Sequence, residues 1–418
     1  MLVRHRKVAL IVLLILGLVM WFVPSSKWQS AYPLRPSKDL AVSNKGPSAD
    51  QILNSTLGFQ HIYTINLPSR TDRRDAMTLA AALSGLSITW IDGVAGKDVS
   101  AKVLPGGGLA ADLPTGNKGS WRAHMNALQR IIQENVTTAL ILEDDADWDI
   151  RLKAQLQVFA RAALPFTQPV ASAGNLPLSE LYRKDSASPL PSAPAATFSP
   201  YGSTWDVLWL GHCGTSFPPS SPSPQQPPPL IVTIADDPTV PAPSHLKPHP
   251  FALRDVLADK YPPHTRVVHA SSGTICTQAY AVTQQGARRL LWRFGLAEEK
   301  MGKGWDLLLG DWCDGLYLND DRGHVGGEGH GVSEEQAANR EKQQHKPVCV
   351  TVQPPLFSHH FRKGGSSDIM ALGGGFVRAE KSMTPYVRLS VRLNMERLVD
   401  GMEPVDQWEE EVAEKVSD

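Results

Sequence analysis

The sequence predicts an α/β domain built on a parallel sheet. Short apolar runs alternate with segments of helical periodicity, as in 61–67, 75–86 and 88–91, and the order strand, helix, strand opens such a sheet. The 418 residues, 42% of them hydrophobic, suffice for a substantial core. An apolar run at 139–142 ends abruptly in acidic residues, as expected of a buried strand whose carboxyl end borders a site.

The N-terminus predicts a membrane anchor. Residues 1–7 form a cytosolic tail with Arg4, Arg6 and Lys7, and the apolar stretch 8–23 has 16 residues, close to the lower limit of about 17 for a bilayer span. Because basic residues stay on the cytosolic side, we expect a single-pass type II protein whose remainder is lumenal, in the Golgi or endoplasmic reticulum membrane. The alternative is a cleaved signal peptide.

Composition narrows the possible partners. A formal net charge of −1 provides no global basic field, so we expect no nucleic acid partner. Glycosylation acceptor motifs begin at Asn54 and Asn135, consistent with the lumen. The cysteines lack the paired spacing of a zinc site and suit two disulfides, with three pairings open. They are Cys213, Cys276, Cys313 and Cys349.

The predicted elements follow in order within one domain at 57–385, after a polar stem at 24–56. The first strand, 61–67, runs into an Arg-rich turn at 68–74, which leads into the helix 75–86. Further strands are expected at 88–91, 205–211, 274–282 and 348–352, and further helices at 121–135 and 284–292.

Three stretches interrupt this regularity and are expected to be disordered insertions. Residues 165–204 and 216–263 hold most of the prolines, and 319–346 is charged and Gly-rich. The C-terminal segment 386–418 is expected to form a helix and then an acidic tail, without chemistry.

Five carboxylates follow the apolar run, at Glu143, Asp144, Asp145, Asp147 and Asp149. Such a cluster requires a counter-charge, and oxygen-only ligands favour Mg²⁺ or Mn²⁺ together with a diphosphate. Side chains one residue apart on an extended chain share a face, so Glu143 with Asp145, or Asp145 with Asp147, would make a ligand pair. The alternative is a strand end followed by a helix whose acidic first turn complements its dipole.

Taken in order, these blocks resemble glycosyltransferase family 25, the group of bacterial lipooligosaccharide and collagen galactosyltransferases, in its filamentous-fungal form. The matching blocks are 62–74, Gly-Ser-Trp-Arg-Ala-His at 119–124, Leu-Glu-Asp-Asp at 142–145, 205–211 and 279–287. Two positions depart from the family pattern, with Ser120 in place of Cys and Ala123 in place of Ser.

The resemblance implies a GT-A type fold, a Rossmann-like α/β/α sandwich in which a DxD-like motif holds Mn²⁺ (or Mg²⁺) on a UDP-sugar. It makes Glu143, Asp145 and Asp147 the expected metal ligands, joined by a late histidine, His359 or His360. The alternative for the histidines is stacking or hydrogen bonding in the core. Contacts to the nucleotide sugar are expected from Asn66, Arg70, Arg73, Arg74, His124 and Asp144, although each of the arginines has a surface salt bridge as its alternative.

Inverting transfer to a hydroxyl needs a general base, usually a carboxylate. The acidic block 305–314 resembles the family's downstream block, and it offers Asp306 or Asp311 as that base. The alternative for either residue is a helix cap or a first-turn acid.

The expected function is therefore transfer of a hexose, with galactose as the expected sugar, from a UDP-sugar to a hydroxyl of a glycan or glycoprotein. Clustered acids also occur in metal-dependent phosphoesterases and in glycoside hydrolases, but two-carboxylate hydrolases need no nucleotide. A catalytically degenerate lumenal binding protein is a third possibility, because of Ser120, Ala123 and the insertions.

Overall fold

The computed structural model describes residues 49–105, 113–167, 175–181, 199–219, 227–248, 254–297, 302–318, 346–364 and 381–408. The predicted anchor at 8–23 lies outside these residues. Within them, no helix combines the length and the apolar character that a bilayer crossing requires.

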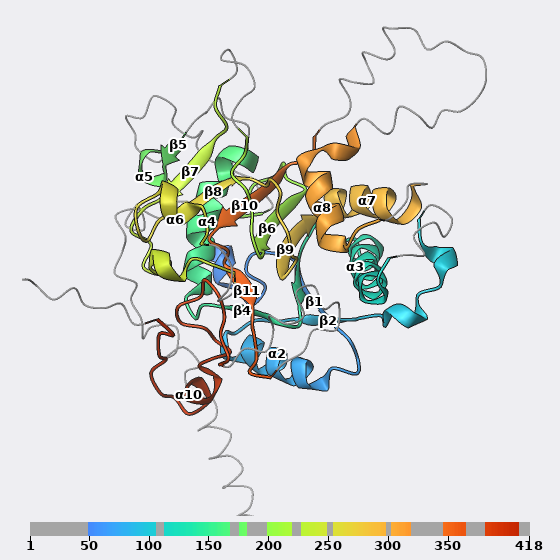
Figure 1. The fold of residues 1–418 in the computed structure, drawn as a ribbon, viewed down its shortest axis with the longest axis horizontal. Helices are drawn as coiled ribbons and strands as arrows, with labels where there is room; N and C mark the ends of the chain where they lie inside the picture. The colour runs from blue at the N-terminus through green and yellow to red at the C-terminus, as the bar shows by residue number, and fades with distance from the viewer. Residues whose placement is uncertain are drawn as a thin grey trace, which may run out of the picture. The chain divides into compact units, whose positions relative to one another are not determined.

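A single mixed sheet forms the centre of the fold (Figure 1). Its strands are β1 (His61–Asn66), β2 (Thr89–Asp92), β3 (Thr138–Glu143), β4 (Ala146–Trp148), β5 (Asn175–Pro177), β6 (Val207–Gly211), β7 (Ile231–Ile234), β8 (Arg266–Ala270), β9 (Ala279–Thr283), β10 (Cys349–Gln353) and β11 (Phe357–His359). The order is β2-β1-β3-β9-β6-β10-β8-β7-β5, and β11 pairs with β4 and β6.

The sheet departs from the predicted parallel arrangement at β9. β1 is parallel to β2 and β3, as expected, but β9 is antiparallel to both of its neighbours, β3 and β6. β8 is likewise antiparallel to its neighbours β10 and β7. β8 and β9 therefore run in the same direction, opposite to β6 and β10, which lie between them in the sheet.

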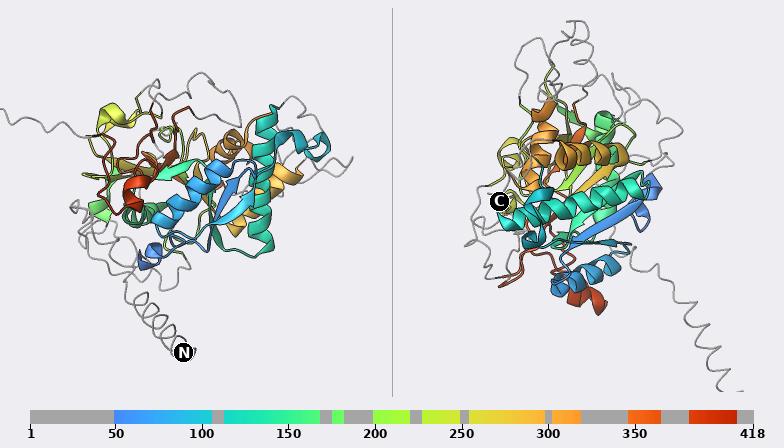
Figure 2. Two further views of the ribbon diagram at one scale, coloured as in Figure 1. Left: turned by 90° about the horizontal axis from the view of Figure 1, so that it is seen from below. Right: turned by 90° about the vertical axis from the view of Figure 1, so that its right-hand side faces the viewer.

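Helices cover both faces of the sheet. The longer ones are α2 (Thr71–Leu83), α3 (Thr115–Gln133), α4 (Leu152–Thr167), α7 (Gln284–Leu291) and α8 (Trp305–Asp314). Short helical segments are η2 (Ala49–Leu53), η3 (Gly96–Asp98), η4 (Ala101–Val103), α5 (Leu178–Leu181), η5 (Pro243–His245), α6 (Leu257–Lys260), η6 (Trp292–Leu296), η7 (Leu316–Leu318) and α10 (Met395–Val399). Figure 2 shows α3 and α7 side by side on one face.

Two cores lie on opposite faces of the sheet because side chains alternate along each strand. In β1, Ile62 packs into the core beneath α2 and α4, whereas Tyr63 packs into the core beneath α3, α7 and α8. In β3, Leu140 and Ile141 divide in the same way. The result is the expected Rossmann-like α/β/α sandwich.

Parts of the predicted insertions and of the stem are folded. Residues 231–234 form β7, in which Val232 and Ile234 are buried, and Tyr201 is fully buried. The prolines on either side led us to predict disorder here, although these short apolar motifs are part of the core. Ile52, in the predicted stem, is also fully buried. The insertion at 319–346 lies outside the described residues except for its last residue.

The C-terminal segment is packed rather than mainly helical. Its helix is limited to α10, and the residues before it are extended or turned. Val387 and Val391 are buried, and the backbone N–H of Val391 donates to the carbonyl of Trp148 at 2.9 Å.

His212 follows β6 and is buried as a neutral imidazole. Its Nε2 lies 2.9 Å from the carbonyl oxygen of Val352, which makes Nε2 the protonated nitrogen, and Nδ1 is buried without a partner. Burial lowers the pKa of His212 to about 4, with only a partial offset from the bond to Val352.

This burial predicts acid sensitivity. Between pH 6.5 and pH 4 the unfolded chain binds a proton at His212 that the folded chain does not, so stability falls as the pH falls through this window. We expect urea unfolding to show a loss from pH 7 to pH 5 that is about 2 kcal/mol larger for the natural chain than for His212→Gln. Equal losses in the two proteins would contradict the burial of a neutral histidine.

Candidate functional site

The carboxyl ends of β1, β2 and β3 meet at one edge of the sheet. The register places Asn66 beside Asp92, and Ile65 beside Glu143. β3 ends at Glu143, and the following two residues turn the chain into β4. Ligands of open α/β sheets bind outside such strand ends, so the acidic turn at 143–147 occupies the expected position.

A guanidinium neutralises the acidic turn. Nη1 of Arg73, in the first turn of α2, lies 2.7 Å from Oδ1 of Asp144 and 2.8 Å from Oδ2 of Asp145. Asn66, at the end of β1, donates from Nδ2 to Oδ2 of Asp144 at 2.8 Å. The acids therefore do receive the counter-charge that the sequence requires, but from an arginine of the chain.

A second arginine supports the same turn from the C-terminal segment. Arg392 donates from Nε to the carbonyl of Ala146 at 2.9 Å and from Nη2 to the carbonyl of Asp144 at 2.7 Å. Its own backbone N–H donates to Oδ1 of Asp147 at 3.1 Å. Sequence reasoning missed Arg392 because it follows its partners by more than 240 residues.

The two adjacent acids differ in proton affinity. Burial, then the charge of Asp145, raises the pKa of Asp144 despite Arg73. Burial also acts to raise the pKa of Asp145, but the positive charges of His359, Arg73 and Arg392 outweigh it and lower that pKa to about 2. Asp145 is therefore the more acidic member of the pair.

Asp147 has a structural role instead of the predicted metal-binding one. The residue is fully buried. Oδ1 accepts from the N–H groups of Trp148 and Arg392, and Oδ2 accepts from the hydroxyls of Thr384 and Ser390. Both carboxylate oxygens of Asp147 are thus occupied by hydrogen bonds from the protein and are not available to a cation. The bonds from Thr384, Ser390 and Arg392 anchor the C-terminal segment. Asp149 is similar, since both of its oxygens bind Arg151 at 2.7 Å.

Strand pairing brings the predicted histidines to the acidic turn. β11 lies antiparallel to β4, with His359 opposite Ala146. Nδ1 of His359 is 3.6 Å from Oδ2 of Asp145. His360, the predicted ligand, instead has its Nδ1 2.9 Å from the hydroxyl of Thr384, and burial lowers its pKa to about 4.

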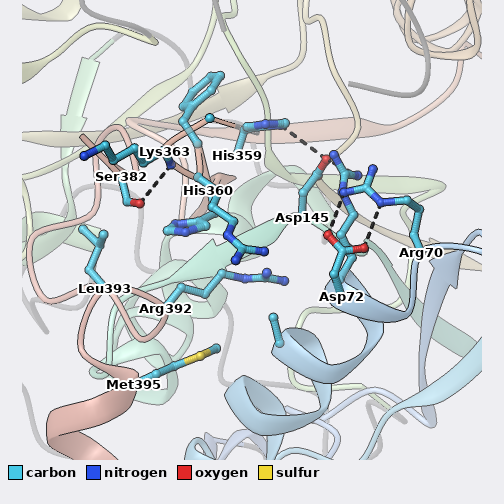
Figure 3. Close-up of a pocket in the computed structure, with 15 residues that line it drawn as sticks. Arg70, Asp72, Asp145, His359, His360, Lys363, Ser382, Arg392, Leu393 and Met395 are labelled. Atoms are coloured by element: carbon cyan, nitrogen blue, oxygen red, sulfur yellow. Dashed lines mark hydrogen bonds and ion pairs between the residues drawn. The ribbon is translucent and has the colours of Figure 1, made fainter. Parts of the chain in front are cut away.

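Two pockets adjoin the turn. The larger, which we call the basic pocket, has a volume of about 760 Å³ (Figure 3). The smaller, which we call the glycine-rich pocket, has a volume of about 380 Å³ and lies against 93–97 and 115–120 at the carboxyl ends of β1 and β2. Arg73 and Asp145 line both, so the pockets meet at the acidic turn.

Two glycines of the glycine-rich pocket lie where the backbone segments that form it are in close contact, so a side chain would not fit. A Cβ on Gly96 would lie 1.6 Å from the carbonyl oxygen of Thr115, and one on Gly119 would lie 2.4 Å from the carbonyl oxygen of Val94. Ile65 and Leu67 add apolar surface. The glycines therefore let the backbone of 93–97 lie in contact with the start of α3, which shapes this wall of the pocket.

Glu143 and His124 form the polar wall of the glycine-rich pocket. Oε1 of Glu143 accepts from the hydroxyl of Thr277 at 2.6 Å and lies 3.8 Å from Nε2 of His124. His124 stacks on Trp305 and contacts the hydroxyl of Tyr280 at 3.0 Å. The two family departures, Ser120 and Ala123, line the same pocket, so the hydroxyl that Ala123 lacks is missing from the pocket wall.

The two predicted bases differ in their surroundings. Oδ2 of Asp306 accepts from the N–H of Cys276 at 3.0 Å, next to Thr277, which binds Glu143. Asp311 is instead held by Nζ of Lys303 at 2.5 Å, and neither aspartate lines the two pockets. Asp306 is therefore closer to the site through its hydrogen-bond partners.

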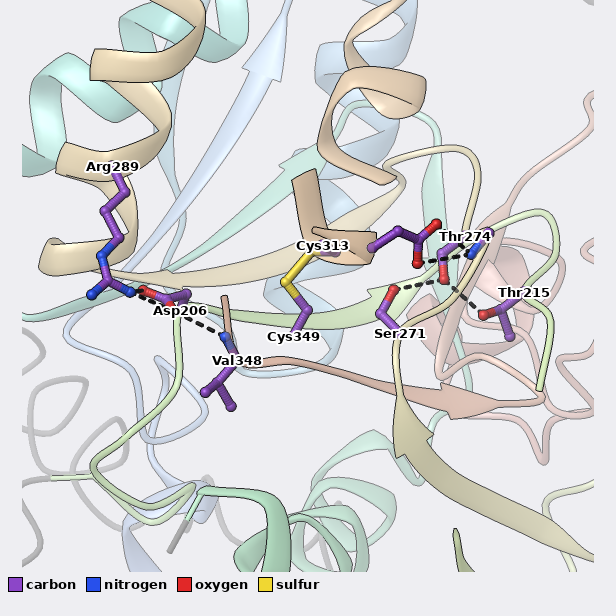
Figure 4. Close-up of a disulfide and its surroundings, with 10 residues drawn as sticks. Asp206, Thr215, Ser271, Thr274, Arg289, Cys313, Val348 and Cys349 are labelled. Atoms are coloured by element: carbon purple, nitrogen blue, oxygen red, sulfur yellow. Dashed lines mark hydrogen bonds and ion pairs between the residues drawn. A yellow bond between two sulfur atoms is a disulfide. The ribbon is translucent and has the colours of Figure 1, made fainter. Parts of the chain in front are cut away.

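Two disulfides fix the surroundings of Asp306 and resolve the open pairing. They are Cys213–Cys276 and Cys313–Cys349. The first holds the loop that binds Asp306, and the second ties the end of α8 to the start of β10 (Figure 4).

Two of the predicted nucleotide contacts, Asn66 and Arg74, line neither pocket. Arg74 stacks over Trp90 at 4.6 Å and lies 3.8 Å from Asp92. Arg70 does line the basic pocket, paired with Asp72 at 2.9 Å. Arg74 diverges from Arg73 because adjacent residues on α2 face different directions.

The predicted metal ligands do not converge on one point. No group of three or more His, Cys, Asp or Glu side chains in the described part of the chain is arranged to hold a metal ion. Oδ1 of Asp145 is buried without a partner, but Asp147 is saturated and Glu143 is bound to Thr277. As arranged, these residues do not fit the Mn²⁺ or Mg²⁺ that the sequence led us to expect.

The comparisons bear on the same edge of the sheet. Residues 59–173, from β1 to the end of α4 and beyond, match the model of glycosyltransferase family 25 (LPS biosynthesis protein). This segment belongs to glycosyltransferase family 25. It contains Arg73, His124 and the acidic turn, and the family resemblance noted in the sequence is confirmed.

Curated relatives share this family 25 segment. Procollagen galactosyltransferase 1 of Danio rerio is 27% identical over 136 residues, which are 30% of this chain and 21% of the relative. A glycosyltransferase 25 family member of Anopheles gambiae is 34% identical over 100 residues, or 21% of this chain and 17% of the relative. Procollagen galactosyltransferase 2 of Mus musculus is 24% identical over 135 residues, or 30% and 20%. The chain thus spans about a fifth of the length of these relatives.

The structural role of Asp147 predicts a stability defect. Asp147→Asn replaces one acceptor oxygen with a donor amide, and it faces buried donors from Thr384, Ser390 or the backbone. We expect urea unfolding to show a loss of about 3 kcal/mol. The matched control, Asp400→Asn at an exposed position, should change stability by about 0.5 kcal/mol or less. Equal effects of the two substitutions would contradict the anchoring role.

Proposed function

We propose that the protein transfers a hexose, with galactose as the expected sugar, from a UDP-sugar to a hydroxyl of a glycan or glycoprotein. The observation that carries this proposal is the meeting of two pockets at Arg73 and Asp145, on the carboxyl ends of β1 and β3. Membership of residues 59–173 in family 25 supports the reaction class, and the names of the relatives support galactose.

The donor would lie across both pockets. The nucleoside suits the glycine-rich pocket, where Ile65, Leu67 and the glycines at 93 and 96 lie at the ends of β1 and β2. The diphosphate would then reach Arg73, and the sugar would lie beside the acidic turn. We propose a GT-A type arrangement on this basis, with the chain anchored as a type II protein in a Golgi or endoplasmic reticulum membrane.

Transfer would proceed with inversion. The acceptor hydroxyl oxygen forms a bond to the anomeric carbon while the bond to the β-phosphate oxygen breaks, and the departing UDP takes the electron pair. A carboxylate must remove the hydroxyl proton, and Asp306 is the better placed of the two predicted bases. Arg73 offers positive charge to the departing diphosphate. No step in this scheme passes through a metal ion, because the residues present do not fit one.

A second candidate, a binding protein without turnover, has one observation in its favour. Ala123 leaves the wall of the glycine-rich pocket without the hydroxyl of the family pattern. Such a protein would bind a nucleotide sugar and release it unchanged.

The deciding experiment is hydrolysis of a panel of UDP- and GDP-sugars by the purified full-length chain, with Mn²⁺, with Mg²⁺ and with EDTA. Slow cleavage of one donor would establish the transferase class and identify the sugar. Binding of a nucleotide sugar without cleavage in any condition, and without transfer to glycan acceptors, would favour the binding protein.

The assignment of the base gives a paired prediction. Asp306→Asn should lower donor cleavage about 100-fold or more, since proton transfer contributes about 10²–10⁴, while the affinity for the donor is retained. Asp311→Asn, a control on the same helix, should leave cleavage nearly unchanged because Asp311 is paired with Lys303 and, unlike Asp306, has no hydrogen bond to the segment that binds Glu143. The reverse ranking would assign the base to Asp311.

A further inference from the structure

We propose that the basic pocket binds the pyrophosphate of the donor directly through the chain's own cations, without a divalent metal ion. The inference rests on the proposed function, because the pyrophosphate is that of the nucleotide sugar. It departs from the metal-dependent chemistry that the acidic motif led us to expect.

The acidic turn already has its counter-charge. Arg73 bridges Asp144 and Asp145 at 2.7 and 2.8 Å, and Arg392 binds the carbonyls of Asp144 and Ala146 from the other side. A divalent ion would have to displace the half-buried guanidinium of Arg73 from two carboxylates. It would then find a single unpartnered oxygen, Oδ1 of Asp145, whereas such ions require several oxygen ligands in a fixed geometry.

The surroundings of the turn are strongly cationic. Five cations line the basic pocket against two carboxylates. The cations are Arg70, Arg73, Arg362, Lys363 and Arg392, and the carboxylates are Asp72 and Asp145. Arginine is the side chain best suited to phosphate oxygens, because its planar fork donates two parallel hydrogen bonds.

Two of these cations are available to a ligand. Arg362 and Lys363 are exposed, and neither has a carboxylate partner among the described residues. The backbone N–H of Lys363 donates to the hydroxyl of Ser382 at 3.0 Å, which holds this part of the rim in place. Arg362 and Lys363 come shortly after β11, so the strand that positions His359 also positions these two cations.

The cations surround the cavity. Figure 3 shows Arg70 with Asp72 on one side of the basic pocket, Lys363 with Ser382 on the opposite side, and Arg392 between them. The volume of about 760 Å³ accommodates a diphosphate together with part of a sugar. Positive charge from several directions is what a group with several anionic oxygens requires, and it would supply the charge neutralisation otherwise assigned to a metal ion.

Calorimetry with inorganic pyrophosphate tests the proposal directly. The full-length chain should bind pyrophosphate in the presence of EDTA, with an affinity that falls as salt is raised, and UDP should displace it. Arg362→Gln and Lys363→Gln should each weaken binding about 10- to 100-fold, as expected for a lost hydrogen bond to a charged group. Lys102→Gln, which removes an exposed lysine on η4 outside both pockets, is the matched control.

The possible outcomes separate this inference from the proposed function. Pyrophosphate or UDP binding that requires Mn²⁺ or Mg²⁺ would overturn the inference, even if donor cleavage established the transferase. Binding in EDTA that UDP does not displace would also overturn it, because the anion site would not be that of the donor. Metal-free binding displaced by UDP, with no donor cleaved under any condition, would support the pocket assignment while the proposed function failed.

Discussion

The bridge from Arg73 to Asp144 and Asp145 is the interaction on which the site depends. Two adjacent carboxylates at a buried strand end repel each other strongly unless a positive charge lies between them. The first turn of α2 supplies that charge, and Asn66 supplies a hydrogen bond to Asp144. The position of α2 relative to β3 is therefore coupled to the ionisation of the acids, and the two pockets meet where this bridge lies.

The C-terminal segment completes the site from the opposite end of the chain. Thr384 and Ser390 bind Asp147, and Arg392 binds the carbonyls of the turn. The C-terminal segment thus binds the backbone of the turn and Asp147, while Arg73 on α2 binds the side chains of Asp144 and Asp145. A segment that contributes no regular strand to the sheet thereby fixes the backbone on which the acids are mounted, and it also forms part of the basic pocket.

The family match and the site overlap only in part. The matched segment, 59–173, supplies Arg73, His124 and the acidic turn. Lys363, Arg392 and the histidine of β11 come from beyond it. The half of the site that the family model covers is thus the glycine-rich pocket and the turn, whereas most of the basic pocket is built from later residues. Features of the basic pocket therefore have to be argued from this chain's own geometry.

The sequence by itself determined the elements with strong local patterns. β1, α3, β3, β9 and α7 lie where apolar periodicity predicted them, and the acids do lie at a strand end. These predictions succeeded because the period of the side chains is a local property. Three of the longer helices, α2, α3 and α7, and six strands follow from the same reasoning. The choice of Arg73 and His124 as site residues came instead from the Arg-rich turn and the family resemblance.

Only the tertiary structure decided which acid does what. In the sequence, Asp145 belongs to both candidate ligand pairs and Asp147 to one, and both are expected to bind a metal ion. In the fold, Thr384 and Ser390 arrive beside Asp147 while Arg73 arrives beside Asp145. The same holds for the disulfide pairing and for the direction of β9. Contacts between residues far apart in the chain set each of these, and no local pattern encodes which distant partner a side chain will meet.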